Sequence, residues 1–276
     1  HTRLQGDWSS DVCSSDLRNI MKDDFGFEVP VEIVPIPSGG VTYDIESPLH
    51  GLKTVEITAM TAKDEDILTS RALIKKGTVI TELLRSCLVN RSIDPGEMLS
   101  GDRNAVMVAL RVTGYGPGYK VEVDCPECGT KSKQSFDLSQ LAIKRLEVDP
   151  VVMGDNLFEV QLPVTKKTVR VKFLTGHDEK EMMIINERKK KSGLSTDTGV
   201  TDRLTRCIES VDDISDKNKI AFFVKNMPVR DSLALRRFLD NQEPGVEMKG
   251  HLRCNSCFEE SEVELPIGAS FFWPET

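Results

Sequence analysis

Two pairs of cysteines are the residues in this sequence best suited to chemistry. Cys125 and Cys128 stand in Cys-Pro-Glu-Cys-Gly, and Cys254 and Cys257 stand in Cys-Asn-Ser-Cys. Four thiolates form the closed tetrahedral shell of a structural zinc ion, and two CxxC pairs are a common source of such a shell. The sequence therefore predicts one structural zinc ion bound by all four cysteines.

Each pair is expected to lie in a tight turn between two antiparallel strands. Alternating residues 119–123 precede the first pair, and residues 135–138 form the predicted return strand. The second pair lies between strands predicted around Leu252 and over residues 263–265. Such a zinc-knuckle hairpin aims two sulfurs at one point. The long interval between the pairs exceeds that of a simple zinc ribbon, so either the two hairpin tips meet within the chain or a neighbouring subunit completes the site.

Three other interpretations of the CxxC pairs stay open at this stage: a redox-active pair, a disulfide within each pair, and knuckles without metal. In redox enzymes the first cysteine lies at a helix N-terminus, which lowers its pKa. Here a strand is predicted to follow, and Pro126 has no counterpart in the second pair. Disulfides are rare in the cytoplasm, so zinc is favoured.

The other candidate catalytic residues favour structural roles. Cys87 and Cys207 stand alone in apolar helical stretches, where a buried thiol packs as a small hydrophobe. The four histidines form no recognisable catalytic pattern. The acids that follow Thr61 and Thr175 are typical of helix starts rather than of acid–base pairs. We find no phosphate-binding loop or nucleophile elbow and predict a non-enzymatic protein with no catalytic residues and no small-molecule substrate.

The composition of the chain disfavours further classes of protein. The net charge of −8 and the pI of about 5.2 disfavour a nucleic-acid binder, because phosphate contacts need clustered Lys and Arg. The one dense basic run, 188–191, is expected to be a solvated helix end or loop. No apolar run is long enough to cross a bilayer, and no secretory signal is found, so membrane insertion and secretion are not expected.

The N-terminal residues are treated separately. Residues 7–17 resemble the conceptual translation of a short-read sequencing adaptor, so we expect 1–17 to be a disordered artefact that replaces the true start. Residues 18–30 are then an N-terminal segment.

The remaining sequence contains an internal repeat. Residues 61–65 resemble 175–179, residues 81–88 resemble 201–208, and the helical stretch 103–111 corresponds to 230–238. Pro-Gly and then a CxxC pair follow in each copy. This order predicts an α+β fold of two tandem units, 31–148 and 149–276. Each unit has an antiparallel strand pair, about three helices and a zinc-knuckle hairpin; the predicted strands are 41–45, 55–59, 158–162 and 169–173.

At the level of the whole unit, the sequence resembles the baseplate hub and tail assembly proteins of T-even-type tailed phages. The matching parts are Thr61–Glu65 after a strand, Arg85–Asn90, Gly101–Arg111, and Tyr115-Gly116 followed by Lys120–Gly129. The C-terminal Phe271-Phe272-Trp273-Pro274 also resembles endings of related tail proteins; it is either a docking segment or part of the core.

The resemblance implies a non-enzymatic structural or assembly subunit of a contractile tail baseplate. Its partners would be other phage tail or baseplate proteins, and its location the virion tail or the host cytoplasm during assembly. The alternative function is a zinc-ribbon regulatory protein that binds nucleic acid, and the third is a redox enzyme.

Overall fold

The computed structural model describes residues 20–22, 28–191, 198–267 and 271–272. Helices and small antiparallel sheets alternate along these residues, which confirms the predicted α+β class. The segment 1–17, predicted to derive from an adaptor, lies outside the described residues.

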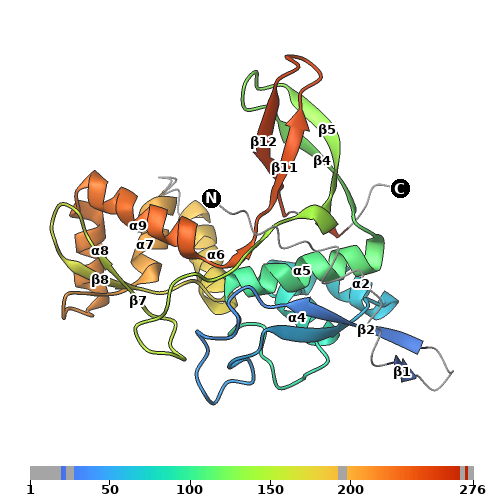
Figure 1. The fold of residues 1–276 in the computed structure, drawn as a ribbon, viewed down its shortest axis with the longest axis horizontal. Coiled ribbons are helices and arrows are strands. Elements are labelled where there is room, and N and C mark those ends of the chain that lie inside the picture. The colour runs from blue at the N-terminus through green and yellow to red at the C-terminus, as the bar shows by residue number, and fades with distance from the viewer. Residues whose placement is uncertain (1–19, 23–27, 192–197, 268–270, 273–276) are drawn as a thin grey trace.

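The first half of the chain forms a small sheet, a helical layer and a hairpin. The sheet is antiparallel in the order β1-β2-β3. A long helix, α5, follows three shorter ones and leads into the first cysteine hairpin (Figure 1). The elements are β1 (Ile20–Lys22), β2 (Glu28–Pro35), β3 (Thr54–Thr58), α2 (Ala62–Thr69), α3 (Arg71–Lys76), α4 (Val79–Cys87), α5 (Ser100–Tyr115), β4 (Gly118–Asp124), β5 (Lys131–Asp137), η1 (Leu138–Gln140) and β6 (Ile143–Lys144).

The second half also has six described strands in a similar order of elements, with β9 placed between two helices. Its sheet has the order β7-β8-β9, and β10 pairs with β6 of the first half. The elements are β7 (Phe158–Gln161), β8 (Thr168–Val171), α6 (Gly176–Lys191), α7 (Gly199–Cys207), β9 (Ile208–Val211), α8 (Lys217–Asn226), α9 (Val229–Gln242), β10 (Gly245–Val246), β11 (Lys249–Arg253) and β12 (Glu260–Glu264).

Helix α5 is the central element. It runs through the middle of the molecule, with β2 and α2 towards one end and α6–α9 towards the other, while both cysteine hairpins project from one side (Figure 1). Its N-terminal turn passes so close to the second half that a Cβ on Gly101 would lie 1.7 Å from the carbonyl oxygen of Pro244. At its other end the buried Arg111 guanidinium donates to the carbonyls of Gly116, Gly118 and Phe271. Both hairpins are thereby anchored to one rigid helix.

The strand predicted over 41–45 is wrong. These residues form turns, and the strand that pairs with β3 is β2, which begins at Glu28. The alternation of apolar and polar residues does not mark a strand here, because Tyr43 is buried for a different reason. Its hydroxyl donates to Asp102 at 2.6 Å and accepts from the backbone N–H of Leu99 at 2.9 Å. Each half also has four described α-helices rather than about three, since the stretches before Gly77 and Met227 add α3 and α8.

Two buried aspartates that the sequence did not single out position loops in the two halves. Asp102, in the first turn of α5, accepts from the N–H and hydroxyl of Ser38 at 2.9 and 2.6 Å. Asp231, in the first turn of α9, accepts from the N–H groups of Val164 and Thr165 at 2.8 and 3.0 Å. Both aspartates are 0% exposed. In each half, therefore, the loop between the first two long strands is fastened to the start of the last helix.

The predictions for the lone cysteines and the basic run agree with the structure. Cys87 and Cys207 are each 1% exposed at the ends of α4 and α7, and burial raises the pKa of both thiols to about 12. The run 188–191 ends α6, where Lys189 pairs with Asp202. Among the described residues, no helix has the length and apolar character needed to cross a membrane.

Candidate metal centre

Both CxxC pairs lie in turns that join two antiparallel strands. Residues 125–130 connect β4 to β5, and residues 254–259 connect β11 to β12. In each turn the N–H of the first cysteine donates to a carbonyl five residues later, at 3.0 Å, and its carbonyl accepts from the residue four positions later. That residue is Gly129 in one turn and Phe258 in the other, and both have left-handed φ angles, 69° and 63°. The two turns therefore share one backbone shape.

The two turns bring their four sulfurs together. Cys125 Sγ lies 3.8 Å from Cys257 Sγ, and Cys128 Sγ lies 3.6 Å from Cys254 Sγ. All four sulfurs lie within 4.8 Å of one another. A tetrahedron of sulfurs, each about 2.3 Å from a central zinc ion, has edges of about 3.8 Å. The spacing therefore suits a tetrahedral four-sulfur metal site within one chain.

The geometry argues against two of the alternatives. All six described cysteines are free thiols, and even Cys128 Sγ and Cys254 Sγ, 3.6 Å apart, lie well beyond the roughly 2.05 Å of a disulfide bond. Moreover, the close pairs join different hairpins rather than the two cysteines of one CxxC. Neither Cys125 nor Cys254 begins a helix, unlike the first cysteine of a redox-active pair.

Electrostatics within the cluster favours partial ionisation. Hydrogen bonds from the hydroxyl and N–H of Thr130 lower the pKa of Cys128 to about 6. The pKa of Cys257 is raised to about 12: the N–H of Glu259 favours its thiolate, but desolvation and the three neighbouring sulfurs together outweigh that bond. Sulfurs this close cannot all carry a negative charge unless a cation offsets their repulsion. A divalent metal ion would supply that charge and let all four ionise.

The hairpins pack closely below their tips. Gly250 of β11 leaves room for Phe136 of β5, because a Cβ there would lie 2.4 Å from the ring. The Tyr119 hydroxyl donates to the carbonyl of Pro266 at 2.7 Å, and the Tyr119 ring meets Phe271 edge-on. Cys125 and Cys254 are buried at this junction, whereas Cys128 is exposed. Packing thus brings the tips together before any metal is considered.

The C-terminal aromatic pair belongs to this packing. Phe271 is 0% exposed and Phe272 is 3% exposed, and the centroids of their rings lie 5.1 Å apart. Of the two readings of the tail, core packing therefore holds for these residues. Trp273 lies outside the described residues.

A second group of possible metal ligands was not anticipated. Asp94, Glu97 and His177 bring one ligand atom each within 4.8 Å of the others, and all three are exposed. Asp94 already pairs with Arg85 at 3.0 Å, and the His177 ring lies 3.3 Å from Glu97. No spacing in the sequence could have indicated this group, because His177 comes from a distant helix start.

Comparison with known proteins decides the family. Residues 41–273 match the family described as T4 bacteriophage base plate protein. The chain belongs to that baseplate family. A search of curated proteins found no match, and a search of solved structures found none either. The match covers both halves of this baseplate-family chain and all four clustered cysteines, so the resemblance noted in the sequence is confirmed.

Proposed function

We propose that this chain is a non-enzymatic structural or assembly subunit of a contractile phage tail baseplate, and that a structural zinc ion held by Cys125, Cys128, Cys254 and Cys257 joins its two halves. Membership of the baseplate family supports the role in the tail. The observation that carries the zinc proposal is the meeting of four sulfurs from two hairpins within 4.8 Å.

The donor set favours a structural metal. Thiolates are soft ligands that suit zinc, and four of them fill a tetrahedral shell. A catalytic zinc ion keeps a coordination position for water or substrate, which this shell would not leave. The ion would therefore hold the hairpins together and leave function to the protein's surfaces.

Matched contacts support the proposal that the halves, 31–148 and 149–276, arose by duplication. Thr61 and Asp64 form a capping box at the start of α2, and Thr175 and Asp178 bond in the same way at the start of α6. The residue after α4 pairs with β3, as the residue after α7 pairs with β8; the bridges are Ile57 to Leu88 and Val171 to Ile208. If the chain arose by duplication and its two copies pack against each other, their equivalent hairpin tips would lie close together.

Metal analysis of purified protein tests the site. We expect about one zinc ion per chain, bound by the four thiolates of a closed shell. Cys125→Ser and Cys254→Ser should each abolish it, although they lie in different hairpins. Cys87→Ser and Cys207→Ser are the matched controls, because these buried thiols lie away from the cluster and should leave the zinc content unchanged. Loss of zinc in only one of the two hairpin variants would contradict the shared site.

Analysis of tails from a phage that encodes this chain tests the role. We expect the protein in purified tails, labelled by antibody at the distal end, if it is a baseplate component. A protein that is absent from finished tails but required for baseplate assembly would be an assembly factor, which the proposal also covers. Normal infectious tails after deletion of the gene would overturn the proposal.

A further inference from the structure

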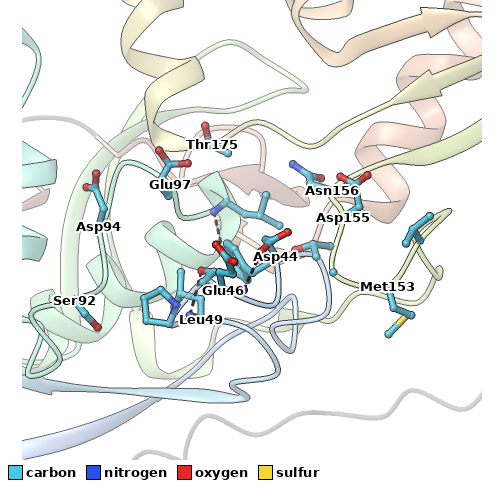
Figure 2. A pocket seen from close by; sticks show the side chains of 17 residues that line it. Asp44, Glu46, Leu49, Ser92, Asp94, Glu97, Met153, Asp155, Asn156 and Thr175 are labelled. Carbon is cyan, nitrogen blue, oxygen red and sulfur yellow. Dashed lines mark hydrogen bonds between the residues drawn. The ribbon is translucent and has the colours of Figure 1, made fainter.

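A groove lies where the two halves meet, away from the cysteine hairpins. It has a volume of about 800 Å³. One wall is the loop 42–49, a second is the segment 92–99, and a third is the loop 152–156. Figure 2 shows Asp94 and Glu97 on one side of the opening, Asp155 on another, and Asp44 and Glu46 between them.

The groove is strongly acidic. Five of its lining residues carry carboxylates, and none of the described lining residues is Lys, Arg or His. Asp94 pairs with Arg85, and Glu97 lies 3.3 Å from the His177 ring. Asp44, Glu46 and Asp155 make no ion pair with any described residue. The groove therefore offers three carboxylates that no described cation neutralises.

Apolar side chains accompany these charges. Val152 and Met153 line the groove and are each 62% exposed, and Ile45 beside it is 78% exposed. Large apolar side chains that gather at a polar groove, rather than standing singly, are typical of a contact surface for another molecule.

A buried polar atom in the groove wall lacks a partner. Thr42 lines the groove and is 4% exposed, and its hydroxyl has no hydrogen-bond partner among the described residues. An unpaired buried hydroxyl is costly, so a hydrogen-bond partner supplied at this wall would be favourable. A donor on an incoming chain would satisfy it.

The walls are held in place without a ligand. The buried Asp102 fixes the first loop through Ser38 and Tyr43. The N–H of Gly154 donates to the carbonyl of Val41 at 2.9 Å, and the Asn156 amide bonds both backbone groups of Phe173. A preformed groove loses little conformational entropy on binding.

We propose that this groove binds a basic segment of a partner protein, one that presents Lys or Arg side chains interleaved with apolar ones. Cations would meet Asp44, Glu46 and Asp155, and apolar side chains would meet Val152 and Met153. This inference rests on the proposed structural role only in that a baseplate subunit needs protein partners. It does not depend on zinc, because the groove and the cysteine cluster share no residue.

Fluorescence anisotropy with a short labelled peptide of alternating Lys and Leu tests the groove. The variant Asp44→Asn, Glu46→Gln, Asp155→Asn should weaken binding about tenfold or more, because rim charges act together on a desolvated cation. A control variant, Asp66→Asn, Glu187→Gln, Asp213→Asn, removes the same charge from exposed sites elsewhere and should change binding less than about twofold. Val152→Ser with Met153→Ser should also weaken binding without changing the charge.

The outcomes separate this inference from the others. If the groove variant and the control variant weaken peptide binding equally, the attraction is diffuse and not specific to the groove. If a Glu–Leu peptide binds as tightly as the Lys–Leu peptide, apolar contact alone explains the binding. Either result would overturn the basic-segment proposal. No binding by the unaltered protein would overturn it as well. Zinc measured on the same samples keeps the tests apart, since lost zinc with retained peptide binding would count only against the metal proposal.

Discussion

The two cysteine hairpins have turns of the same backbone shape built from different residues. Gly129 and Phe258 both adopt a left-handed conformation, at φ 69° and 63°, and each donates its N–H to the first cysteine of its pair. Glycine adopts this conformation freely, whereas a side chain as large as that of phenylalanine is strained by it. Phe258 is 72% exposed, so packing does not offset the strain. The hydrogen bonds of the turn and the direction of the sulfurs, rather than local preference, therefore determine the shape.

The helix starts of the two halves differ in a similar way. Asp64 and Asp178 each use Oδ2 to bond the Thr three residues earlier. Oδ1 of Asp178 also accepts from Lys172 at 3.2 Å and Arg206 at 2.6 Å, whereas Oδ1 of Asp64 is buried and has no partner in the part of the chain that the structure describes. The same capping motif is a local cap in the first half and the centre of an ion-pair network in the second.

Removal of the proposed zinc ion should have the largest effect, because it acts on both hairpins at once. Chelation of zinc should lower the melting temperature by about 10 °C or more, since an ion bound only by the folded chain stabilises it by mass action. Hydrogen exchange should quicken in β4–β5 and β11–β12 together. Exchange that quickens in one hairpin alone would show that the two tips do not share an ion.

Alanine substitutions of the two loop-anchoring aspartates should rank next. Asp102→Ala leaves three buried donors without an acceptor, two from Ser38 and one from Tyr43, and should cost about 4 kcal/mol of unfolding free energy. Asp231→Ala leaves two N–H donors and should cost about 2 kcal/mol.

Denaturant unfolding measures both variants, and an isosteric substitution sharpens the comparison. Desolvation raises the pKa of Asp102 against the opposing hydrogen bonds from Ser38 and Tyr43. Because that environment favours a neutral side chain, Asp102→Asn should cost less than Asp102→Ala. Equal costs for the Asn and Ala variants would show that the hydrogen bonds to Asp102 contribute little.

The pH dependence of stability should distinguish the two helix starts. Desolvation acts to raise the pKa of Asp178, but the N–H of Thr175 and the cations Lys172 and Arg206 together lower it. A lowered carboxyl pKa stabilises the fold above the unfolded value, near 3.9, and this contribution is lost as the pH falls. Asp178→Asn should therefore cost about 2 kcal/mol at pH 7, where it removes hydrogen bonds to a charged group, and clearly less as the pH falls to about 3 and below.

The matched control for this measurement is Asp64→Asn. Asp64 makes no ion pair with a described residue, so its substitution should cost less at pH 7 than that of Asp178. Thermal unfolding at both pH values gives the comparison. A pH-independent cost for Asp178→Asn would show that its two cations contribute nothing to stability.

Substitutions at the two left-handed turn positions should have the smallest effects on stability, and the two effects should have opposite signs. Phe258→Gly should stabilise the protein by about 1 kcal/mol, because it relieves a left-handed side chain without loss of a buried contact. Gly129→Ala should destabilise it by about 1 kcal/mol through the backbone alone, since a Cβ there meets no atom within 4 Å. Chemical denaturation measures both, and a destabilised Phe258→Gly would show that the ring makes a stabilising contact.

Local signals in the sequence predicted local structure well. Thr-x-x-Asp located the starts of α2 and α6, and alternation located β3, β7 and β8. The same rule failed at 41–45, since Tyr43 is buried by a hydrogen bond to Asp102, 59 residues away, rather than by strand pairing. The groove also had no signal, because its walls come from three separate segments.

The sequence by itself determined the four candidate cysteine ligands, the turn between two strands that carries each pair, and the helix starts. These depend on residues within a few positions of one another, where spacing and hydrogen bonds act directly. Only the tertiary structure decided that Cys128 and Cys254, 126 residues apart, lie 3.6 Å from each other. That distance depends on how two hairpins pack on α5 and against Phe136, Gly250 and Phe271, and such long-range packing is not encoded in any one stretch of the chain.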